Sequence, residues 1–278
     1  MLSPPDSRDK VPLLCIVVPC YNEEEVLPQS GNILASAVDN LIGKGKVSPE
    51  SRIIFVDDGS KDSTWDIIAS LHEGNHIFTG IKLAHNEGHQ RALYAGLMDA
   101  LDRSCDISVS IDADLQDDVD VIEEMVDKYA AGAEIVYGVR NNRNTDTGFK
   151  RNTAQTYYRL MNKLGAEVVY NSADFRLMSA RALMALAHYR EANLFLRGMV
   201  PSLGFKTSEV YYSRKERMAG ESKYPLSKML ALAAEGITSF SIEPMHVMTV
   251  VGIIALFVAL IMLIYTIVSC ATGNAVAG

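Results

Sequence analysis

The sequence lacks both of the common glycine-rich nucleotide-binding motifs. No G-x-G-x-x-G follows an apolar run, and no G-x-x-x-x-G-K-[ST] occurs in the 278 residues. These absences exclude a dinucleotide-binding Rossmann domain and a P-loop domain. Positive charge is also in deficit, since the net charge is −8. A general nucleic-acid-binding protein is therefore not expected, because such proteins neutralise phosphates with surplus lysine and arginine.

Cysteine is scarce, and its spacing has no metal or disulfide signature. The four cysteines form no C-x-x-C or Cys/His pattern and lie in or beside apolar segments. We therefore expect buried thiols in a reducing compartment, with no disulfide and no zinc. Residues 1–12 contain no apolar signal segment, so no secretory signal peptide is expected.

What the sequence does contain is a series of apolar runs that end in polar turns. We expect five strands, near residues 13–19, 53–56, 77–83, 107–111 and 134–138. Helical segments separate them, and this alternation predicts an α/β fold with a mostly parallel, doubly wound sheet. Ligands of such sheets bind at the carboxyl ends of the strands, which is where the polar turns fall.

The run Ile107–Asp118 is the most informative of these segments. An apolar strand leads into four carboxylates, and Asp112 and Asp114 follow it two residues apart. Mg²⁺ and Mn²⁺ prefer such oxygen ligands, and Gln116 offers another oxygen from the same run. The spacing leaves open a solvated acidic loop in which Asp118 caps the next helix. A receiver-type phosphoacceptor domain also has aspartates at strand ends, but the length and the apolar C-terminal segment count against it.

Charge and hydropathy are distributed unevenly along the chain. Residues 140–163 contain six basic residues and one acidic residue, and residues 206–228 contain six basic and three acidic ones. Basic islands in an acidic protein indicate bound phosphates or an anionic membrane surface. Val247–Cys270 has 24 residues without a charge, which predicts a transmembrane helix, with a buried core helix as the alternative. Basic residues precede this span and none follow it, so the N-terminal part is expected to face the cytoplasm.

Several motifs, taken in order, resemble those of glycosyltransferase family 2. They are V-V-P-C-Y-N-E from Val17, V-D-D-G-S-K-D-S-T from Val56, N-E-G-H-Q-R-A-L from Asn86 and D-A-D-L-Q from Asp112. Two later motifs, S-A-D-F-R-L-M from Ser172 and R-K-E-R-M-A-G-E-S-K-Y from Arg214, look like those of the polyprenyl-phosphate glycosyltransferases. This group includes bactoprenol glucosyltransferases and dolichol-phosphate mannose synthases. The resemblance covers nearly the whole chain from Leu13.

The resemblance implies a GT-A fold that binds a nucleotide sugar, with a UDP-linked sugar favoured. The residues that would bind this donor are Pro19, Tyr21, Glu23, Asp58, Asp112 and Arg140. The alternative for Asp58 is a turn-forming role beside Gly59. Asp112 and Asp114, with Gln116 nearby, would hold Mg²⁺ or Mn²⁺ against the diphosphate.

The resemblance also places Asp174 near the reacting centre, as a base or as an orienter of the acceptor. The alternative is a structural pairing with Arg176. A phosphate-monoester acceptor is largely dianionic near neutral pH, because its second pKa is about 6, so positioning is expected to outweigh proton removal. Arg214 and Lys215 are expected to join Asp174 in catalysis. The residues expected to bind the acceptor phosphate are Arg217, Ser222 and Lys223. His89 is expected to line or cap its loop.

The expected organisation has four parts. A GT-A catalytic domain spans 1–205, a basic acceptor loop with amphipathic interface helices spans 206–245, a transmembrane helix spans 246–270, and a tail spans 271–278. An apolar stripe at helical spacing before the span predicts the amphipathic helix, which lies in the membrane interface or packs in an oligomer. Relatives of the bactoprenol type usually have a second membrane helix, so the tail is expected to be truncated before it, with absence of that helix as the alternative.

The sequence therefore predicts an integral membrane protein with a cytoplasmic, metal-dependent and inverting glycosyltransferase domain. A UDP-linked hexose is the expected donor and polyprenyl phosphate the expected acceptor, and a homo-oligomer is compatible with this prediction. A processive polysaccharide synthase would carry Q-x-x-R-W, whereas the only tryptophan, Trp65, lies in the second motif. The alternative from another class is a catalytically silent, membrane-tethered scaffold that binds a nucleotide sugar.

Overall fold

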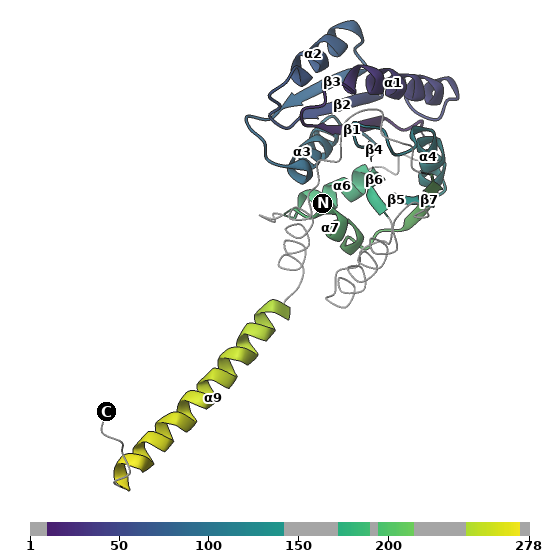
Figure 1. The fold of residues 1–278 in the computed structure, drawn as a ribbon. Coiled ribbons are helices and arrows are strands. Elements are labelled where there is room, and N and C mark those ends of the chain that lie inside the picture. The colour runs from purple at the N-terminus through teal and green to yellow at the C-terminus, as the bar shows by residue number, and fades with distance from the viewer. Residues whose placement is uncertain (1–9, 142–171, 190–193, 214–242, 273–278) are drawn as a thin grey trace.

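The computed structural model describes residues 10–141, 172–189, 194–213 and 243–272. Figure 1 shows an α/β domain with helices on both faces of one sheet, and one long helix that stands apart. The sheet has seven strands in the order β3-β2-β1-β4-β6-β5-β7. The expected α/β class and the mostly parallel sheet are confirmed.

Parallel strands form the first half of the sheet. They are β1 (Leu14–Cys20), β2 (Arg52–Asp57), β3 (Phe78–Lys82) and β4 (Ile107–Ser110). β1 pairs with both β2 and β4, and all of its residues are buried. A continuous apolar run is typical of such a strand, because helices cover both faces of the sheet. The helices that connect these strands are α1 (Leu27–Gly43), α2 (Thr64–Gly74) and α3 (His89–Asp102).

The second half of the sheet is mixed, and only β5 of its three strands was predicted. β6 (Ser172–Ser179) lies between β4 and β5 (Ile135–Arg140) and runs antiparallel to both. β7 (Thr207–Tyr212) pairs in parallel with β5 at the edge. The sheet thus has two strands more than the sequence indicated, and it extends beyond residue 205, the expected end of the catalytic part. β6 escaped prediction because it contains the charged residues Asp174 and Arg176, which interrupt its apolar pattern.

Two hydrophobic layers enclose the sheet. On one face, α1, α2 and α4 (Ile122–Ala130) pack with the strands, and the short 3-10 helix η2 (Val119–Val121) precedes α4. On the other face, the packing helices are α3, α6 (Ala180–Ala187) and α7 (Leu196–Ser202). Asp118 caps η2 by accepting from the N–H of Asp120. This three-layer packing fixes the carboxyl ends of β1, β2 and β4 along one edge.

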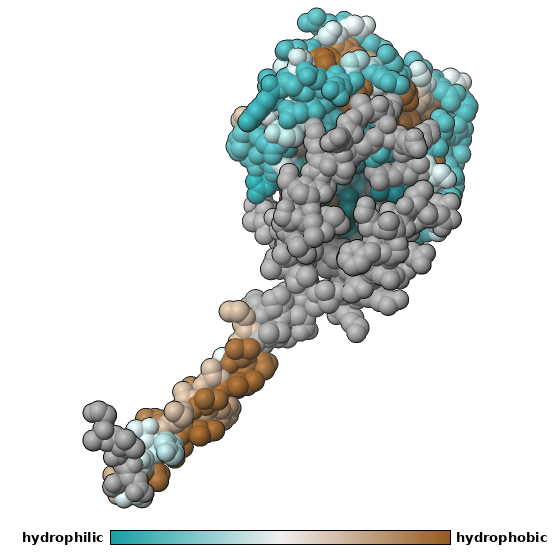
Figure 2. Space-filling view, viewed as in Figure 1, coloured by the Kyte–Doolittle hydropathy of each residue, from teal (hydrophilic) through white to brown (hydrophobic). Residues whose placement is uncertain are grey.

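Helix α9 (Glu243–Ala271) stands apart from the sheet domain. Its segment Met248–Ala271 has 24 residues and contains an 18-residue window with a mean hydropathy of 2.9, none of which is buried. By length and composition this helix could cross a membrane. Figure 2 shows apolar surface (brown) along α9, whereas the described part of the sheet domain is mainly hydrophilic (teal) on the same view. Cys270 is consequently exposed, unlike the other three cysteines. The predicted amphipathic helix falls on residues outside the described ranges.

Candidate functional site

The acidic turn after β4 is anchored in the core by a leucine. The N–H of Leu115 donates to the carbonyl oxygen of Asp112 at 3.2 Å. Leu115 has a φ of +43°, a left-handed conformation that is costly for a leucine. The conformation persists because the Leu115 side chain is only 5% exposed and packs in the hydrophobic layer beneath. The flanking carboxylates are thereby held at the edge of the sheet.

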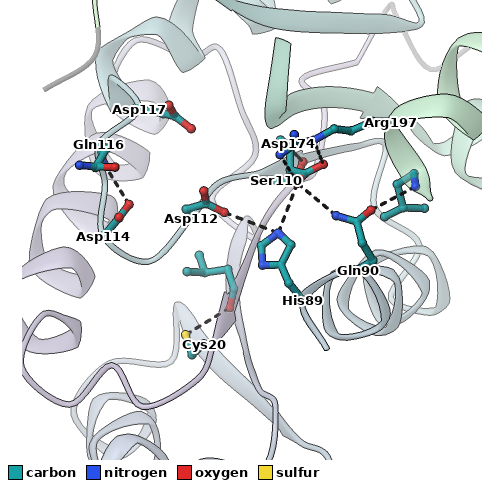
Figure 3. A network of polar contacts seen from close by, with 12 residues as sticks. Cys20, His89, Gln90, Ser110, Asp112, Asp114, Gln116, Asp117, Asp174 and Arg197 are labelled. Carbon is teal, nitrogen blue, oxygen red and sulfur yellow. Dashed lines mark hydrogen bonds and ion pairs between the residues drawn. The ribbon is translucent and has the colours of Figure 1, made fainter. Parts of the chain in front are cut away.

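Asp112, Asp114 and Gln116 all lie on this turn. Figure 3 shows Asp112 directed toward His89, while Asp114 lies beside Gln116. The backbone N–H of Gln116 donates to Asp114 Oδ1 at 3.3 Å. Although 43% of the Asp112 side chain is exposed, the surrounding protein desolvates its carboxylate and, with negative neighbours such as Asp174, raises its pKa.

The donor atoms of this turn fit a hard divalent cation. Carboxylate and amide oxygens are ligands that Mg²⁺ and Mn²⁺ take, and these ions keep positions open for water and phosphate. Among the described residues, no three His, Cys, Asp or Glu side chains are grouped so that they could hold a metal. Asp112, Asp114 and Gln116 are therefore candidate ligands by their chemistry, and their role in metal binding stays a prediction.

Asp174 reaches the same edge from β6. β4 and β6 are antiparallel with Ser110 opposite Arg176, so Asp174 lies beside the residues that follow Ser110. The hydroxyl of Ser110 donates to the carbonyl oxygen of Asp174. The pairing of these two strands thus brings Asp174 close to the acidic turn, although the two are distant in the sequence.

The Asp174 carboxylate is buried among positive charges. The residue is 4% exposed. Arg176 Nη2 donates to Asp174 Oδ1 at 2.6 Å, and Arg197 Nη2 donates to Oδ2 at 3.0 Å. Burial alone would raise the pKa of Asp174, but Arg197, His89 and Arg176 hold it well below its usual value. Such a carboxylate is a weak proton acceptor, which favours an orienting role over that of a general base. The pairing with Arg176 that the sequence left open is present.

His89 lies between the two carboxylates, as the first residue of α3. Its Nε2 is 3.7 Å from Asp112 Oδ1 and 3.4 Å from Asp174 Oδ2 (Figure 3). Burial lowers the pKa of His89, but the hydrogen bond with Asp174 and the charge of Asp112 raise it overall. From the sequence, His89 was expected only to line or cap its loop. A lone histidine has no spacing that would reveal partners on two other segments.

Gln90 and Arg197 also belong to the site, although the sequence did not single them out. Gln90 Nε2 donates to Asp174 Oδ2 at 3.1 Å, and its Oε1 accepts the N–H of Leu196 at 3.1 Å. Arg197 follows on α7 and contacts the same carboxylate. Both residues reach β6 from helices far away in the sequence, so no local pattern could have indicated these contacts.

The predicted donor-binding residues of the first loop gather at the end of β1. Pro19 is buried in the strand, and Tyr21 is 40% exposed. The backbone N–H of Glu23 donates to Thr64 Oγ1 at 2.9 Å, which ties this loop to the start of α2. Tyr21 therefore lies in a loop that is tied down at the carboxyl end of β1.

Asp58 shapes the loop before α3. Its Oδ1 accepts the N–H of Glu87 at 2.7 Å, and its Oδ2 accepts the N–H of Gly88 at 3.0 Å. Asp58 is only 3% exposed. Asp58 thus fixes the backbone conformation just before His89. This structural role differs from the alternative that the sequence left open, a turn-forming role beside Gly59. The donor-binding role of Asp58 stays a prediction.

Arg140, the last residue of β5, contacts the segment that follows the acidic turn. Its Nη2 donates to Asp117 Oδ1 at 3.0 Å, and its Nε donates to the hydroxyl of Tyr212 at 3.2 Å. The Tyr212 hydroxyl in turn donates to Asp117 Oδ1 at 2.6 Å. Arg140 is thereby attached to the segment that carries the candidate metal ligands. The remaining predicted site residues lie outside the described ranges, namely Arg214, Lys215, Arg217, Ser222 and Lys223.

The chain is similar to known glycosyltransferases along most of its length. The family model described as "Glycosyl transferase family 2" matches residues 15–186. An uncharacterized glycosyltransferase, YkoT of Bacillus subtilis strain 168, is 56% identical over 252 residues, which cover 91% of this chain and 74% of that protein. The bactoprenol glucosyl transferase of Shigella phage SfV is 39% identical over 254 residues, which cover 91% and 78% of the two chains.

The fold is also similar to that of solved glycosyltransferase structures. Glucosyl-3-phosphoglycerate synthase from Mycobacterium tuberculosis, in complex with Mn²⁺, UDP and phosphoglyceric acid, matches with a TM-score of 0.52. The sequence identity is 16%, and the match covers 82% of this chain and 77% of that one. At this identity the likeness concerns the fold alone, and it confirms the expected GT-A architecture.

Proposed function

The chain belongs to glycosyl transferase family 2 and is a glycosyltransferase, and on this premise we propose that it transfers a hexose from a UDP-sugar to polyprenyl phosphate. The relatives named bactoprenol glucosyl transferase support the lipid acceptor. Helix α9 supports a membrane location, because its span is long and apolar enough to cross a bilayer. In this proposal the catalytic domain faces the cytoplasm, and the product is a polyprenyl-monophosphate-linked sugar.

The position of His89 between Asp112 and Asp174 is the main structural support. The contacts measure 3.7 and 3.4 Å, so the metal-side carboxylate and the acceptor-side carboxylate share one neighbour. A phosphate oxygen that attacks the anomeric carbon must approach close to the group that holds the donor's diphosphate. In this proposal the donor's diphosphate lies near Asp112 and the acceptor phosphate near Asp174, at the edge where α/β sheets bind ligands.

On the donor side, the first loop and Asp58 would enclose the nucleoside, with the exposed ring of Tyr21 available for stacking on the base. Arg140 would bind the donor phosphates, because arginine forks match phosphate oxygens. The Mn²⁺ named for the mycobacterial synthase supports a divalent cation here as well. When bound by Asp112 and Asp114 with Gln116, such an ion would neutralise charge that develops on the departing nucleoside diphosphate.

On the acceptor side, an oxygen of the lipid phosphate attacks the anomeric carbon. The bond from that carbon to the diphosphate oxygen breaks, and its electron pair leaves with the nucleoside diphosphate, so a single displacement inverts the anomeric configuration. The acceptor needs no base, because a phosphate monoester is largely dianionic above its second pKa of about 6. Asp174 then orients the charged groups around the nucleophile. Arg214 and Lys215 would act beside it, and Arg217, Ser222 and Lys223 would bind the acceptor phosphate.

The proposal is tested by following label from a panel of radiolabelled UDP- and GDP-sugars into organic-extractable lipid. The full chain in detergent is supplied with undecaprenyl phosphate and Mg²⁺, with and without a chelator. Asp114→Asn tests the metal side. Asp120→Asn is the matched control, since this acid is exposed in the same segment.

We expect one UDP-hexose to label the lipid, and we expect the chelator and Asp114→Asn to abolish labelling while Asp120→Asn does not. Labelling that withstands both the chelator and Asp114→Asn would contradict the metal dependence. Binding of a nucleotide sugar without any lipid-linked label would contradict the transfer reaction and favour the silent scaffold.

A further inference from the structure

Three polar side chains meet where β5 and the edge strand β7 end (Figure 1). Arg140 and Tyr212 lie opposite each other in this parallel pair of strands. Arg140 Nε donates to the Tyr212 hydroxyl at 3.2 Å, and Arg140 Nη2 donates to Asp117 Oδ1 at 3.0 Å. The Tyr212 hydroxyl donates to the same Asp117 oxygen at 2.6 Å. Because a guanidinium is planar, two anchors on one of its edges fix both its position and the orientation of its plane.

The chemistry of these groups fixes the direction of each hydrogen bond. A guanidinium only donates, and an ionised carboxylate only accepts. The Tyr212 hydroxyl must therefore accept from Arg140 and direct its own proton to Asp117. Hydrogen bonds in such a chain polarise and strengthen one another. A phenylalanine at this position would remove the acceptor of Arg140 Nε and one donor of Asp117.

The ring of Tyr212 is held independently of its hydroxyl. Tyr212 is 3% exposed, and its ring packs edge-on against Phe175, with the centroids 5.4 Å apart and the planes at 87°. Gly138 on β5 leaves the space that both rings occupy. A Cβ atom there would be 2.5 Å from Phe175 Cδ1 and 3.1 Å from Tyr212 Cε1. Removal of the hydroxyl alone should therefore leave the ring in place.

The two anchors are buried, whereas Arg140 reaches the surface. Asp117 is 1% exposed, and the Arg140 side chain is 27% exposed. Asp117 directly follows Gln116, so the same contacts hold Arg140 relative to the segment of the candidate metal ligands. An arginine that is already held in place loses little conformational freedom when it binds an anion, which favours binding.

We propose that the Tyr212 hydroxyl is a positioning group, which orients Arg140 toward the diphosphate of the donor. This inference rests on the proposed function and deepens it, because it gives the edge strand β7 a part in donor binding. Tyr212 acts through Arg140 and does not itself contact the donor. The alternative is that the hydroxyl only stabilises the end of β7 against the rest of the sheet.

A double-variant cycle on UDP binding separates these two roles and requires no sugar transfer. Binding of UDP with Mg²⁺ to the full chain in detergent is measured by calorimetry for the wild type, Tyr212→Phe, Arg140→Gln and the variant with both changes. Uridine, which lacks the diphosphate, is measured by its competition with UDP. Tyr211→Phe is the matched control, because it removes the hydroxyl of a neighbouring tyrosine that is 56% exposed and donates to Glu209.

In Tyr212→Phe we expect the Kd of UDP to rise about five- to tenfold, as loss of a hydrogen bond to a charged group implies. The Kd of uridine should stay within about twofold of the wild type, because uridine has no phosphate for Arg140 to bind. In the Arg140→Gln background Tyr212→Phe should have no further effect, since the group that it orients is gone. Tyr211→Phe should match the wild type.

Unchanged UDP binding in Tyr212→Phe would overturn the inference and, if Arg140→Gln weakens UDP binding, would leave the proposed role of Arg140 standing. An equal loss for UDP and uridine, or a loss that persists beside Arg140→Gln, would also overturn it, because either result indicates a purely structural hydroxyl. Unchanged UDP binding in Arg140→Gln would contradict the proposed role of Arg140 and the inference together. A wild type that does not bind UDP would contradict the UDP-linked donor of the proposed function itself.

Discussion

At the scale of the residue, Asp174 combines a structural and a functional role. Its carboxylate neutralises Arg176, whose side chain is 3% exposed, and it also lies at the proposed acceptor site. Removal of one partner of a buried ion pair leaves the other charge without compensation, which is costly. A loss of activity in an Asp174 variant would therefore not distinguish the two roles unless stability is measured as well.

We expect Asp174→Asn to lower the free energy of unfolding by roughly 3 kcal/mol, because it strands the buried Arg176 charge. The double variant Asp174→Asn/Arg176→Met should recover much of that loss but should not recover sugar transfer. Urea unfolding followed by the fluorescence of the single tryptophan, Trp65, measures the first effect, and the lipid-labelling assay measures the second. A double variant that transfers sugar would contradict a functional role for Asp174.

The depressed pKa of Asp174 predicts a dependence of stability on pH. Its folded-state pKa lies well below the usual value, whereas in the unfolded chain it is about 3.9. The carboxylate therefore contributes stability above the unfolded pKa and loses it as the pH falls from about 5 toward the folded pKa. The difference in unfolding free energy between wild type and Asp174→Asn should narrow from pH 7 to pH 3. A difference that is constant over this range would mean that the ion pair does not set the pKa.

At the scale of the element, helix α3 positions two residues of the site. His89 and Gln90 are in its first turn, and Asp58 fixes the backbone just before them. The middle of the helix lies unusually close to the sheet at Gly96. A Cβ atom there would be 2.4 Å from Val17 Cγ1 and 2.7 Å from Val56 Cγ2. Glycine therefore sets the distance between α3 and the sheet.

We expect Gly96→Ala to destabilise the protein by about 1–3 kcal/mol through overpacking and to reduce transfer by displacing the start of α3. Gly43→Ala is the matched control, because nothing lies within 4 Å of a Cβ at that helical glycine. It should be neutral or slightly stabilising, since alanine is the better helix former. Thermal unfolding of both variants measures the effect. Equal thermal unfolding midpoints for Gly96→Ala and Gly43→Ala would show that α3 can move away from the sheet without loss of stability.

At the scale of the whole molecule, the chain combines a three-layer catalytic domain with a helix that shares none of its core. The segment Met248–Ala271 is not buried at all in the described chain, so its apolar side chains need another environment. A bilayer supplies one, and it also contains the lipid tail of the proposed acceptor.

We expect Leu256→Arg/Leu260→Arg to abolish stable membrane integration, because each arginine near the centre of a span costs about 2.5–3.5 kcal/mol. Thr249→Arg, near the start of the span, should be tolerated because its long side chain reaches the interface. Alkaline carbonate extraction of membranes that contain each variant measures integration. Retention of the double variant in the membrane pellet would mean that another part of the chain anchors the protein.

The sequence by itself determined the features that depend on neighbouring residues. The buried strand β1, the carboxylates of Asp112 and Asp114 at the end of β4 and the apolar span before Cys270 are local patterns. Burial on both faces of a sheet requires a continuous apolar run, and a bilayer requires an apolar segment long enough to span it. The ordered motifs around them were sufficient to indicate the family, which the comparisons confirm.

Only the tertiary structure decided how the site is assembled. The insertion of β6 between β4 and β5 brings Asp174 beside the acidic turn, and it brings His89, Gln90 and Arg197 to one carboxylate. The order of strands in a sheet is set by packing between distant segments, and local periodicity does not encode it. Charged residues in the buried strand β6 also interrupted the pattern that would have predicted it. The physical reason is that their compensation comes from partners elsewhere in the chain, which become neighbours only after folding.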